Sequence, residues 1–308
     1  MSKQGRVAIL GVFVADASYR ATRQPEMGET ILGSSFSLGP GGKGSNQSVA
    51  AARVGGDVSF ITRLGQDEFA RMAFTLYKDE GITAHIEQLA DSYTGSAYIF
   101  LDEKTGDNAI IVCPGAAATI DKAYVQSVRD VITSADVFVT QMEQPLEAAA
   151  EALKIARAAG VVTILNTAPA EAVPDDVFAL CDYVTPNETE AEGYTGVKVS
   201  SVDDARRAGD AFLKKGVGTA MITLGEQGAL LHNAEISELI PAFNAGAVEE
   251  TTGAGDAFNG SFAVALAQGK SPQEAARFGC AVAGLSVTRA GAAASMPQLD
   301  EVNKLLNG

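Results

Sequence analysis

The sequence predicts an α/β protein in which a mainly parallel sheet lies between two layers of helices, a three-layer α/β/α sandwich. Residues 6–14 are mostly apolar with little alternation, which is typical of a strand buried on both faces. Strands then alternate with amphipathic helices along most of the chain. Glycine-rich turns lead into several of these helices. The 308 residues are enough to bury a large core.

The elements follow one another in a regular order. After the strand at 6–14, the pattern predicts a helix over 43–54, a strand over 58–63 and a helix over 67–80. Pro145 and Gly160 bracket a further helix, with a strand over 161–165 directly behind it. Later segments predict strands at 182–185, 219–223 and 229–232 and a helix over 255–268.

Two stretches interrupt this alternation of strands and helices. Residues 18–38 and 94–112 are rich in β-formers and turn residues, and no helix separates their strands. We expect them to form hairpins that leave the main sheet and pair as a small lid, although edge strands of the main sheet are the alternative. The chain is then one domain, 1–308, with lid insertions at about 15–39 and 94–113.

Composition excludes several classes of protein. A hydrophobic content of 46% with 20% charged residues is ordinary for a globular protein, and no apolar run is long enough to span a membrane. The net charge of −15 argues against binding to nucleic acid or to an anionic membrane surface. The N-terminus has no signal-peptide pattern, and the isolated Cys113, Cys181 and Cys280 are typical of reduced thiols. These features favour a cytoplasmic protein.

The most informative segment is ETTGAGDAFNG, from Glu250 to Gly260. Its glycines form a turn that leads into a helix, where unpaired N–H groups and the helix dipole can hold a phosphate. Asp256 lies in that first turn, and a carboxylate beside a phosphate is suited to accept a proton from an attacking hydroxyl. The segment therefore predicts phosphoryl transfer to an alcohol, with simple helix capping by Asp256 as the alternative.

A second glycine turn, GGKGSN at 41–46, opens the helix over 43–54. It is not a Walker A loop, because Ser37 stands at the first glycine position and Gly44 replaces the Ser or Thr that binds magnesium. The open backbone suits a polyhydroxylated ligand, with hydrogen bonds from Asn46 and a charge from Lys43. A tight turn without a ligand is the alternative.

Three further segments end strands with polar residues. In TPNETE, Asn187 and Glu190 face the same way at the start of a helix and could hold a hydrated magnesium ion, or act only as dipole partners. TLGEQG at 223–228 is a glycine turn after a strand and could contact a bound nucleotide. Glu143 in QMEQP could reach polar ligand groups or cap a helix.

Together these segments resemble the ribokinase family of carbohydrate kinases. The pieces occur in family-like order and spacing: GVFVAD from Gly11, GGKGSN, QMEQP, TPNETE, TLGEQG, TTGAGDAFNG and VTRAG. The resemblance implies a Rossmann-like body with a β lid, dimerisation through the lid, and ATP-dependent phosphorylation of a sugar's primary hydroxyl.

The resemblance also implies roles for individual residues. Asp256 would be the general base, and the anion hole would be formed by Gly253, Ala254 and Gly255. The expected sugar-binding residues are Asp16, Gly42, Lys43, Asn46, Glu143 and Asp256. The expected nucleotide-binding residues are Asn187, Thr223, Gly225, Gly228 and Gly255, with Asn244 and Gly279 in neighbouring segments. Glu190 would hold Mg²⁺ through water, and a monovalent cation such as K⁺ would bind, mostly through backbone oxygens, at Glu250, Thr252, Ser286, Arg289, Gly291 and Ser295.

Two departures from the family pattern bear on the choice of sugar. Val14 stands where the family has an asparagine that contacts ribose, and Glu250 replaces the usual aspartate. Ribose is the first expectation, with another pentose or a ketohexose such as fructose as the alternative. A nucleoside kinase is disfavoured because the chain has no Trp and only 6% aromatic residues for stacking a base. A non-catalytic sugar or nucleotide sensor would have no need of Asp256.

Overall fold

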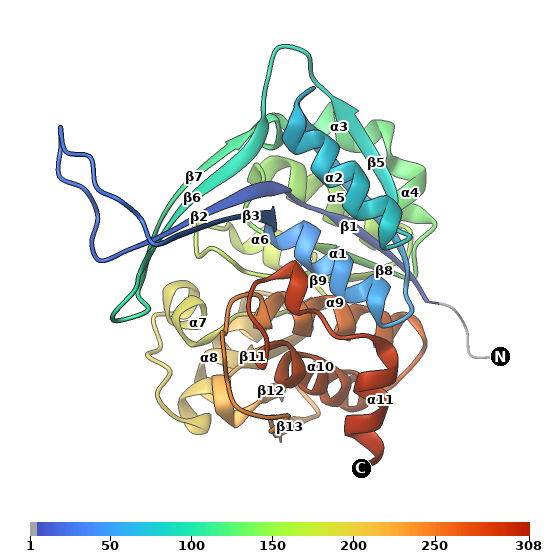
Figure 1. Ribbon diagram of the computed structural model, residues 1–308. Helices are drawn as coiled ribbons and strands as arrows, with labels where there is room; N and C mark the ends of the chain where they lie inside the picture. The colour runs from blue at the N-terminus through green and yellow to red at the C-terminus, as the bar shows by residue number, and fades with distance from the viewer. Residues whose placement is uncertain (1–4) are drawn as a thin grey trace.

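The computed structural model describes residues 5–308 and contains a nine-stranded central sheet (Figure 1). The strands lie in the order β13-β12-β11-β10-β9-β8-β1-β4-β5. All neighbours from β11 to β5 pair in parallel, whereas β12 and β13 continue the sheet antiparallel. Their bounds are β1 (Arg6–Leu10), β4 (Asp57–Leu64), β5 (Thr83–Gln88), β8 (Val137–Thr140), β9 (Val162–Leu165), β10 (Tyr183–Val184), β11 (Thr219–Thr223), β12 (Ala229–His232) and β13 (Ser237–Ile240). The predicted mainly parallel sheet is confirmed.

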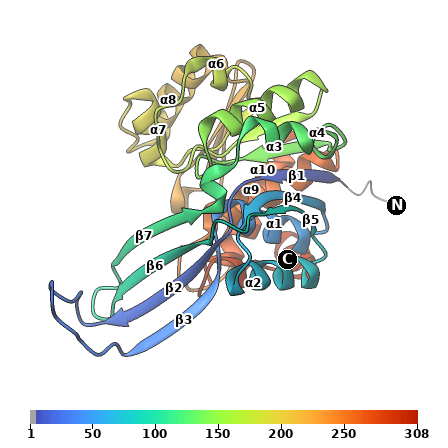
Figure 2. The same cartoon turned by 90° about the horizontal axis from the view of Figure 1, so that it is seen from above.

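Helices cover both faces of this sheet (Figure 2). One layer contains α1 (Lys43–Arg53), α2 (Glu68–Asp79), α9 (Ala254–Ala267), α10 (Pro272–Ser286) and α11 (Leu299–Asn307). The other contains α3 (Lys122–Ser127), α4 (Arg129–Thr133), α5 (Leu146–Ala158), α6 (Asp175–Phe178), α7 (Glu188–Thr195) and α8 (Val202–Lys214). In β1, Val7 and Ile9 pack into the first layer, and Ala8 and Leu10 pack into the second. Burial on both sides explains why this strand does not alternate.

Helix ends follow ordinary capping chemistry. The Asp67 side chain accepts a hydrogen bond from the Ala70 N–H at the start of α2, and Ser271 and Glu274 form a capping box at the start of α10. The helices predicted over 43–54 and 67–80 therefore differ from α1 and α2 by only a residue at either end. No helix within residues 5–308 is long and apolar enough to cross a membrane.

A second, four-stranded sheet projects from the body, and both Figure 1 and Figure 2 show it standing clear of the helical layers. Its order is β3 (Ser35–Gly41), β2 (Val14–Ala21), β6 (Thr94–Asp102) and β7 (Asn108–Gly115). β2 is antiparallel to β3 but parallel to β6, and β6 is antiparallel to β7. The two irregular stretches of sequence thus form a separate sheet and are not edge strands of the main one.

The first strand is shorter than predicted. β1 ends at Leu10, and Val14 belongs to β2 of the small sheet, not to the end of the strand expected over 6–14. Gly11 approaches the start of α1 so closely that a Cβ there would lie 2.7 Å from the Gly44 Cα. The chain after Leu10 thus packs against the N-terminus of α1, where the Ser45 N–H donates to the Val12 carbonyl at 3.2 Å, and then enters the small sheet.

Candidate active site

A cavity of about 170 Å³ opens at the carboxyl ends of the central strands, next to the N-terminus of α9. This is the edge at which parallel α/β sheets generally bind ligands. The predicted residues on its wall are Lys43, Asn187, Glu190, Thr223, Gly253, Gly255 and Asp256. Four further residues line it that the sequence did not single out: Asn166, Ala168, Thr185 and Asn259. Residues far apart in the chain are thus brought together here.

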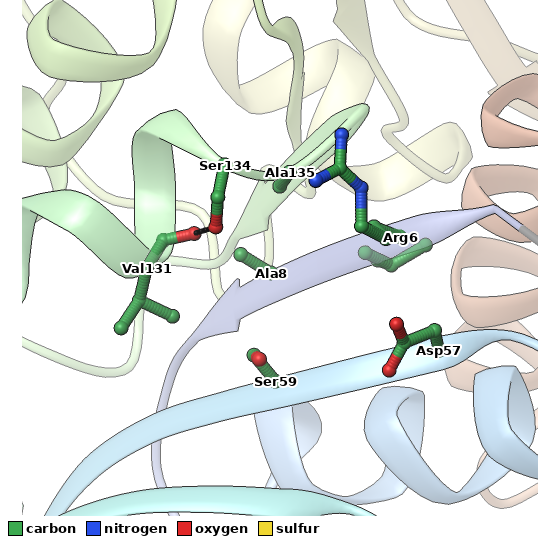
Figure 3. Close-up of a pocket in the computed structure, with 8 residues that line it drawn as sticks. Arg6, Ala8, Asp57, Ser59, Val131, Ser134 and Ala135 are labelled. Carbon is green, nitrogen blue, oxygen red and sulfur yellow. Dashed lines mark hydrogen bonds between the residues drawn. The ribbon is translucent and has the colours of Figure 1, made fainter.

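A second cavity, of about 130 Å³, lies at the opposite edge of the sheet (Figure 3). Its wall includes Arg6 and Asp57 at the starts of β1 and β4, together with Ser134 from the turn before β8. The Arg6 guanidinium pairs with Asp136 at 3.5 Å. Within residues 5–308, none of the motif residues lines this cavity, so the cavity at the carboxyl edge is the candidate active site.

Asp256 lies in the first turn of α9 and is only 8% exposed. Its Oδ2 accepts a hydrogen bond from Asn46 Nδ2 at 3.1 Å, and its Oδ1 accepts one from Gln47 Nε2 at 3.0 Å. Burial raises the pKa of Asp256, whereas the Lys43 charge and the two amide donors act in the opposite direction. The structure therefore holds this carboxylate in one fixed orientation beside a lysine.

The turn before α9 presents backbone donors to the cavity. Gly253 has a φ of 80°, a left-handed conformation that glycine adopts without strain. The Ala254 N–H donates to the Thr251 carbonyl at 3.2 Å, so it is already occupied. In the described part of the chain, the N–H groups of Gly255 and Asp256 have no partner, as expected in a first helical turn. The Gly253 N–H also has no partner among the described residues, so the N–H groups of Gly253, Gly255 and Asp256 are the donors available to an anion, whereas the predicted contribution of Ala254 is not available.

Three carboxylates surround Lys43. Its backbone N–H donates to Glu143 Oε2 at 2.8 Å. Burial alone would lower the pKa of Lys43, but the charges of Asp256, Glu143 and Glu190 together raise it, so the ammonium group stays charged. Burial raises the pKa of Glu143 to about 7. The site thus concentrates negative charge around one cation.

The small sheet contributes Asp16 to this region. Asp16 lies on β2, and its carboxylate covers Gly41 so closely that a Cβ at Gly41 would lie 2.0 Å from Asp16 Oδ2. Burial, and then the charge of Asp256, raises the pKa of Asp16 to about 6. Gly41, directly before Gly42 and Lys43, therefore leaves room for a carboxylate from the small sheet.

On the other side of the cavity, Asn187 and Glu190 form a capping box at the start of α7. Glu190 N–H donates to Asn187 Oδ1 at 2.8 Å, and Asn187 N–H donates to Glu190 Oε2 at 3.0 Å. Burial raises the pKa of Glu190. Thr223 ends β11, where its N–H donates to the Pro186 carbonyl at 2.9 Å. Gly225 begins the turn that follows Thr223.

Four predicted nucleotide-site residues do not line the cavity, and one of them, Gly225, lies in the turn after β11. A Cβ at Gly228 would lie 2.0 Å from the Ile240 carbonyl oxygen, and one at Gly279 would lie 2.8 Å from the Phe258 ring, so both glycines permit close packing. Asn244 is exposed in a loop, where its side chain accepts the Gly246 N–H at 3.2 Å.

The residues expected at a monovalent cation are grouped only in part. Gly291 N–H donates to Glu250 Oε2 at 2.8 Å, which joins the loop before α9 to the loop after α10. Arg289 is turned toward Glu301 of α11. The hydroxyl groups of Ser286 and Ser295 donate to carbonyls three residues earlier, and Thr252 is exposed in the turn before α9. Among residues 5–308, no group of three or more His, Cys, Asp or Glu side chains could hold a metal ion.

Known proteins resemble the chain along nearly its whole length. Residues 4–299 match the family described as pfkB family carbohydrate kinase. Ribokinase of Haemophilus influenzae is 39% identical over 97% of this chain and 98% of its own, and deoxyribokinase of Salmonella typhi is 33% identical over 98% of both.

Solved structures agree with these sequence relatives. The structure of Arabidopsis thaliana ribokinase complexed with ribose and ATP superposes with a TM-score of 0.95 at 30% identity, covering 99% of both chains. The predicted fold, with its body and separate small sheet, and the predicted class of enzyme, a kinase acting on a carbohydrate, are confirmed. The chain belongs to the pfkB family of carbohydrate kinases.

Proposed function

We propose that the protein transfers the γ-phosphoryl group of ATP to the primary hydroxyl of ribose, forming ribose 5-phosphate. The observation that carries this proposal is the buried Asp256 carboxylate, held by two amides beside free helix N–H groups and Lys43. The relatives named ribokinase, including the one solved with ribose and ATP, support the same substrates.

The proposed sugar site lies between Asp256 and the small sheet. Asn46 donates through Nδ2 to Asp256, whereas its Oδ1 is buried without a partner among the described residues and is available to a sugar hydroxyl. Asp16 and Glu143 provide carboxylate acceptors around the same space. A ligand with several hydroxyl donors would satisfy these groups, which are costly to leave buried and unpaired.

The proposed reaction uses Asp256 as the general base. Its carboxylate accepts the proton of the sugar hydroxyl as that oxygen attacks the γ-phosphorus and the bond to the ADP oxygen breaks. The N–H groups of Gly255 and Asp256 and the Lys43 ammonium offset the charge on the phosphoryl group in transfer. Asn187 and Thr223, which line the cavity, and Gly225 in the turn that follows Thr223 would contact the nucleotide.

Two cations are part of the proposal. Glu190 would hold a hydrated Mg²⁺, since its carboxylate retains acceptor capacity beyond the bonds from Asn187 and Mg²⁺ commonly binds through one carboxylate plus phosphate. Mg²⁺ would neutralise charge on the phosphates of ATP. A monovalent cation would bind where Glu250 meets Gly291, and replacing K⁺ by tetramethylammonium should then lower turnover.

The central test is Asp256→Asn, assayed by ADP release with ATP, Mg²⁺ and K⁺ against pentoses, ketohexoses, 2-deoxyribose and nucleosides. Loss of the base should lower kcat by about 10²- to 10⁴-fold while ATP binding is retained. Asp203→Asn, an exposed aspartate in the first turn of α8, is the matched control and should keep wild-type kcat. Near-normal turnover by Asp256→Asn would overturn the assignment.

A second candidate substrate is 2-deoxyribose, which Val14 favours. Val14 lies on the same face of β2 as Asp16 and is 6% exposed, so an apolar side chain stands beside the proposed sugar site. A hydrocarbon cannot pair with a hydroxyl, and the lost bond is worth about 0.5–1.5 kcal/mol. The kcat/KM ratio of 2-deoxyribose to ribose should therefore fall by about 2- to 13-fold in Val14→Asn. An unchanged ratio would remove this role for Val14.

We also propose a homodimer formed through the small sheet. One face of that sheet exposes Tyr19, Phe36 and Ile111, which are 44%, 57% and 63% exposed. The Tyr19 ring centroid lies 5.0 Å from that of Phe36 and 5.6 Å from that of Tyr98, which pairs with Ile111 on β7. These apolar groups are therefore neighbours, as in the patches that mark interfaces. Sedimentation equilibrium should give twice the chain mass, and Ile111→Lys should give the monomer.

We place the protein in the cytoplasm because its three cysteines are free thiols.

A further inference from the structure

A row of buried amide side chains leads away from Asp256 into the protein. Gln47 Nε2 donates both to Asp256 Oδ1 and to Asn166 Oδ1, each at 3.0 Å. Gln47 Oε1 accepts from Gln141 Nε2 at 2.7 Å. Gln47 and Gln141 are fully buried and Asn166 is 6% exposed, so water does not compete for these bonds.

The orientation of each amide follows from its neighbour. Asn166 Nδ2 lies 3.1 Å from the Thr185 backbone carbonyl, which can only accept a hydrogen bond. Asn166 must therefore present its amide nitrogen to Thr185 and its Oδ1 to Gln47. Gln47 must in turn point Nε2 at Asn166 and Asp256, which leaves Oε1 for Gln141. A backbone carbonyl at the end of β10 thus determines which way the Gln47 amide faces.

Gln47 has no spare hydrogen-bonding capacity on its amide nitrogen. One hydrogen goes to Asp256 and the other to Asn166. Turning the Gln47 amide over would place its oxygen against two acceptors, so the bonds to Asp256 and Asn166 would be lost together. The donor that faces Asp256 is therefore fixed in place before any ligand binds.

We propose that Gln47 is a positioning residue for the general base, oriented by Asn166 and Gln141, and that it keeps the Asp256 carboxylate ionised and aimed at the sugar hydroxyl. The inference rests on the proposed kinase function. A purely structural role, in which the amides only satisfy one another in the core, is the competing explanation. The two differ in whether the ionisation of Asp256 depends on Gln47.

The ionisable groups around Asp256 come from four other elements. Lys43 at the start of α1 favours the charged carboxylate. Asp16 on β2, Glu143 before α5 and Glu190 on α7 carry like charges that oppose it. Gln47 is uncharged, so its replacement by leucine removes a hydrogen bond without changing this set of charges. A change in the titration of Asp256 can then be assigned to the lost donor.

The first experiment compares the pH dependence of kcat in the wild type and in Gln47→Leu at saturating ribose and ATP. A hydrogen bond to a charged group is worth about 1.5–3 kcal/mol, so its loss should move the acid limb upward by about 1–2 pH units. Activity should therefore be lost near neutral pH and recovered in part at higher pH, with KM for ATP unchanged. An acid limb at the wild-type position would overturn the proposal.

The matched control is Thr163→Val, which removes buried hydrogen bonds from the Thr163 hydroxyl to the Leu180 carbonyl and Asp182 at nearly constant shape. These bonds lie outside the site. The control should lose stability and keep the wild-type acid limb. If it moved the limb as far as Gln47→Leu does, a general loss of rigidity would explain both results and the proposal would fail.

A second variant tests the order in which the buried amides act on Asp256. Gln141→Leu leaves Gln47 in contact with Asp256 but removes the donor that orients it, so it should move the acid limb in the same direction by a smaller amount. If Gln141 acts only through Gln47, the double variant should match Gln47→Leu, since the effects share one path. Additive shifts of the acid limb in the double variant would contradict the proposal that Gln141 acts through Gln47.

A measurement without turnover separates this inference from the proposed function. The ¹³C carboxyl resonance of Asp256, assigned with Asp256→Asn in protein labelled at aspartate, gives its pKa directly. A higher pKa in Gln47→Leu supports the positioning role even if no sugar in the panel is phosphorylated, in which case only the proposed function fails. An unchanged pKa with turnover intact leaves the function standing and rejects the role of Gln47.

Discussion

Gly260, the last glycine of the segment 250–260, lets α9 approach α1. A Cβ at this position would lie 2.3 Å from the Gln47 carbonyl oxygen and 2.9 Å from the Ala50 Cβ. Ordinary Cβ contacts begin at 3.4 Å, so Gly260→Ala requires the facing backbone to retreat from 2.3 to 3.4 Å, by about 1.1 Å. The obstacle is backbone, not the end of a flexible side chain, so α1 itself must move.

The shift has two measurable consequences. Overpacking of this kind lowers the free energy of unfolding by about 1–3 kcal/mol. Each kcal/mol lowers Tm by roughly 2–4 °C in proteins of about 150–250 residues. The same helix positions Asn46 and Gln47 against Asp256, with donor–acceptor distances of 3.1 and 3.0 Å. A displacement near 1 Å would break both bonds and can lower kcat by about 10²-fold.

The assay combines thermal unfolding with steady-state kinetics. Gly193→Ala is the control, because a Cβ there meets the Ala170 Cβ at an ordinary 3.4 Å inside α7. Alanine is favoured over glycine in a helix by about 1 kcal/mol, so this control should keep Tm or raise it, with kcat unchanged. Wild-type Tm and kcat in Gly260→Ala would refute the argument that this glycine sets the spacing of α1 and α9.

Two other predictions concern stability. Burial raises the pKa of Asp16 from 3.8 to about 6, so the folded protein binds this proton more tightly than the unfolded chain and stability falls as pH rises between these values. Asp16→Asn should therefore gain stability relative to the wild type from pH 4 to pH 7 in urea unfolding, and a constant difference would contradict this. Arg53 pairs with Glu80 at 2.6 Å and donates to the Met296 carbonyl at 2.7 Å, with side chains only 18% and 16% exposed in the pair. Arg53→Met should lower the free energy of unfolding by about 3–5 kcal/mol, because Glu80 is left without its partner. Arg71→Met, which breaks an exposed pair, should lower it by under about 1 kcal/mol. Equal losses would show that burial is not the cause.

The sequence predicted what depends on local pattern. The strands at 219–223 and 229–232 coincide with β11 and β12, because short apolar runs between turn residues define them on their own. The end of β1 was not predicted, because the apolar run continues to Val14 while the segment after Leu10 packs against the start of α1, which follows later in the chain. Val14, which was predicted at the end of a central strand, therefore belongs to the small sheet.

The lining of the candidate site could be predicted from the sequence where a residue lies in a recognisable turn. Lys43, Glu190 and Asp256 all lie in the first turn of a helix, and they meet at one cavity. Gln47 and Asn166 carried no such signal, because a glutamine inside a helix and an asparagine after a strand are common in any sequence. Their importance depends on which side chains face them across the core, and that is a property of the tertiary structure.

The parallel pairing of β2 with β6 has a consequence for how the chain folds. β2 ends at Ala21 and β6 begins at Thr94, so the segment between them, which includes α1, β4, α2 and β5, must be ordered before the two strands can meet. Closing so long a loop early would lose chain entropy without enough contacts to offset it. We expect the small sheet to form after the body and to open before it, so its amide protons should exchange with solvent at a lower free energy than those of β1 and β8. The sheet that carries Asp16, a proposed sugar ligand, would then be the last part to fold and the first to unfold.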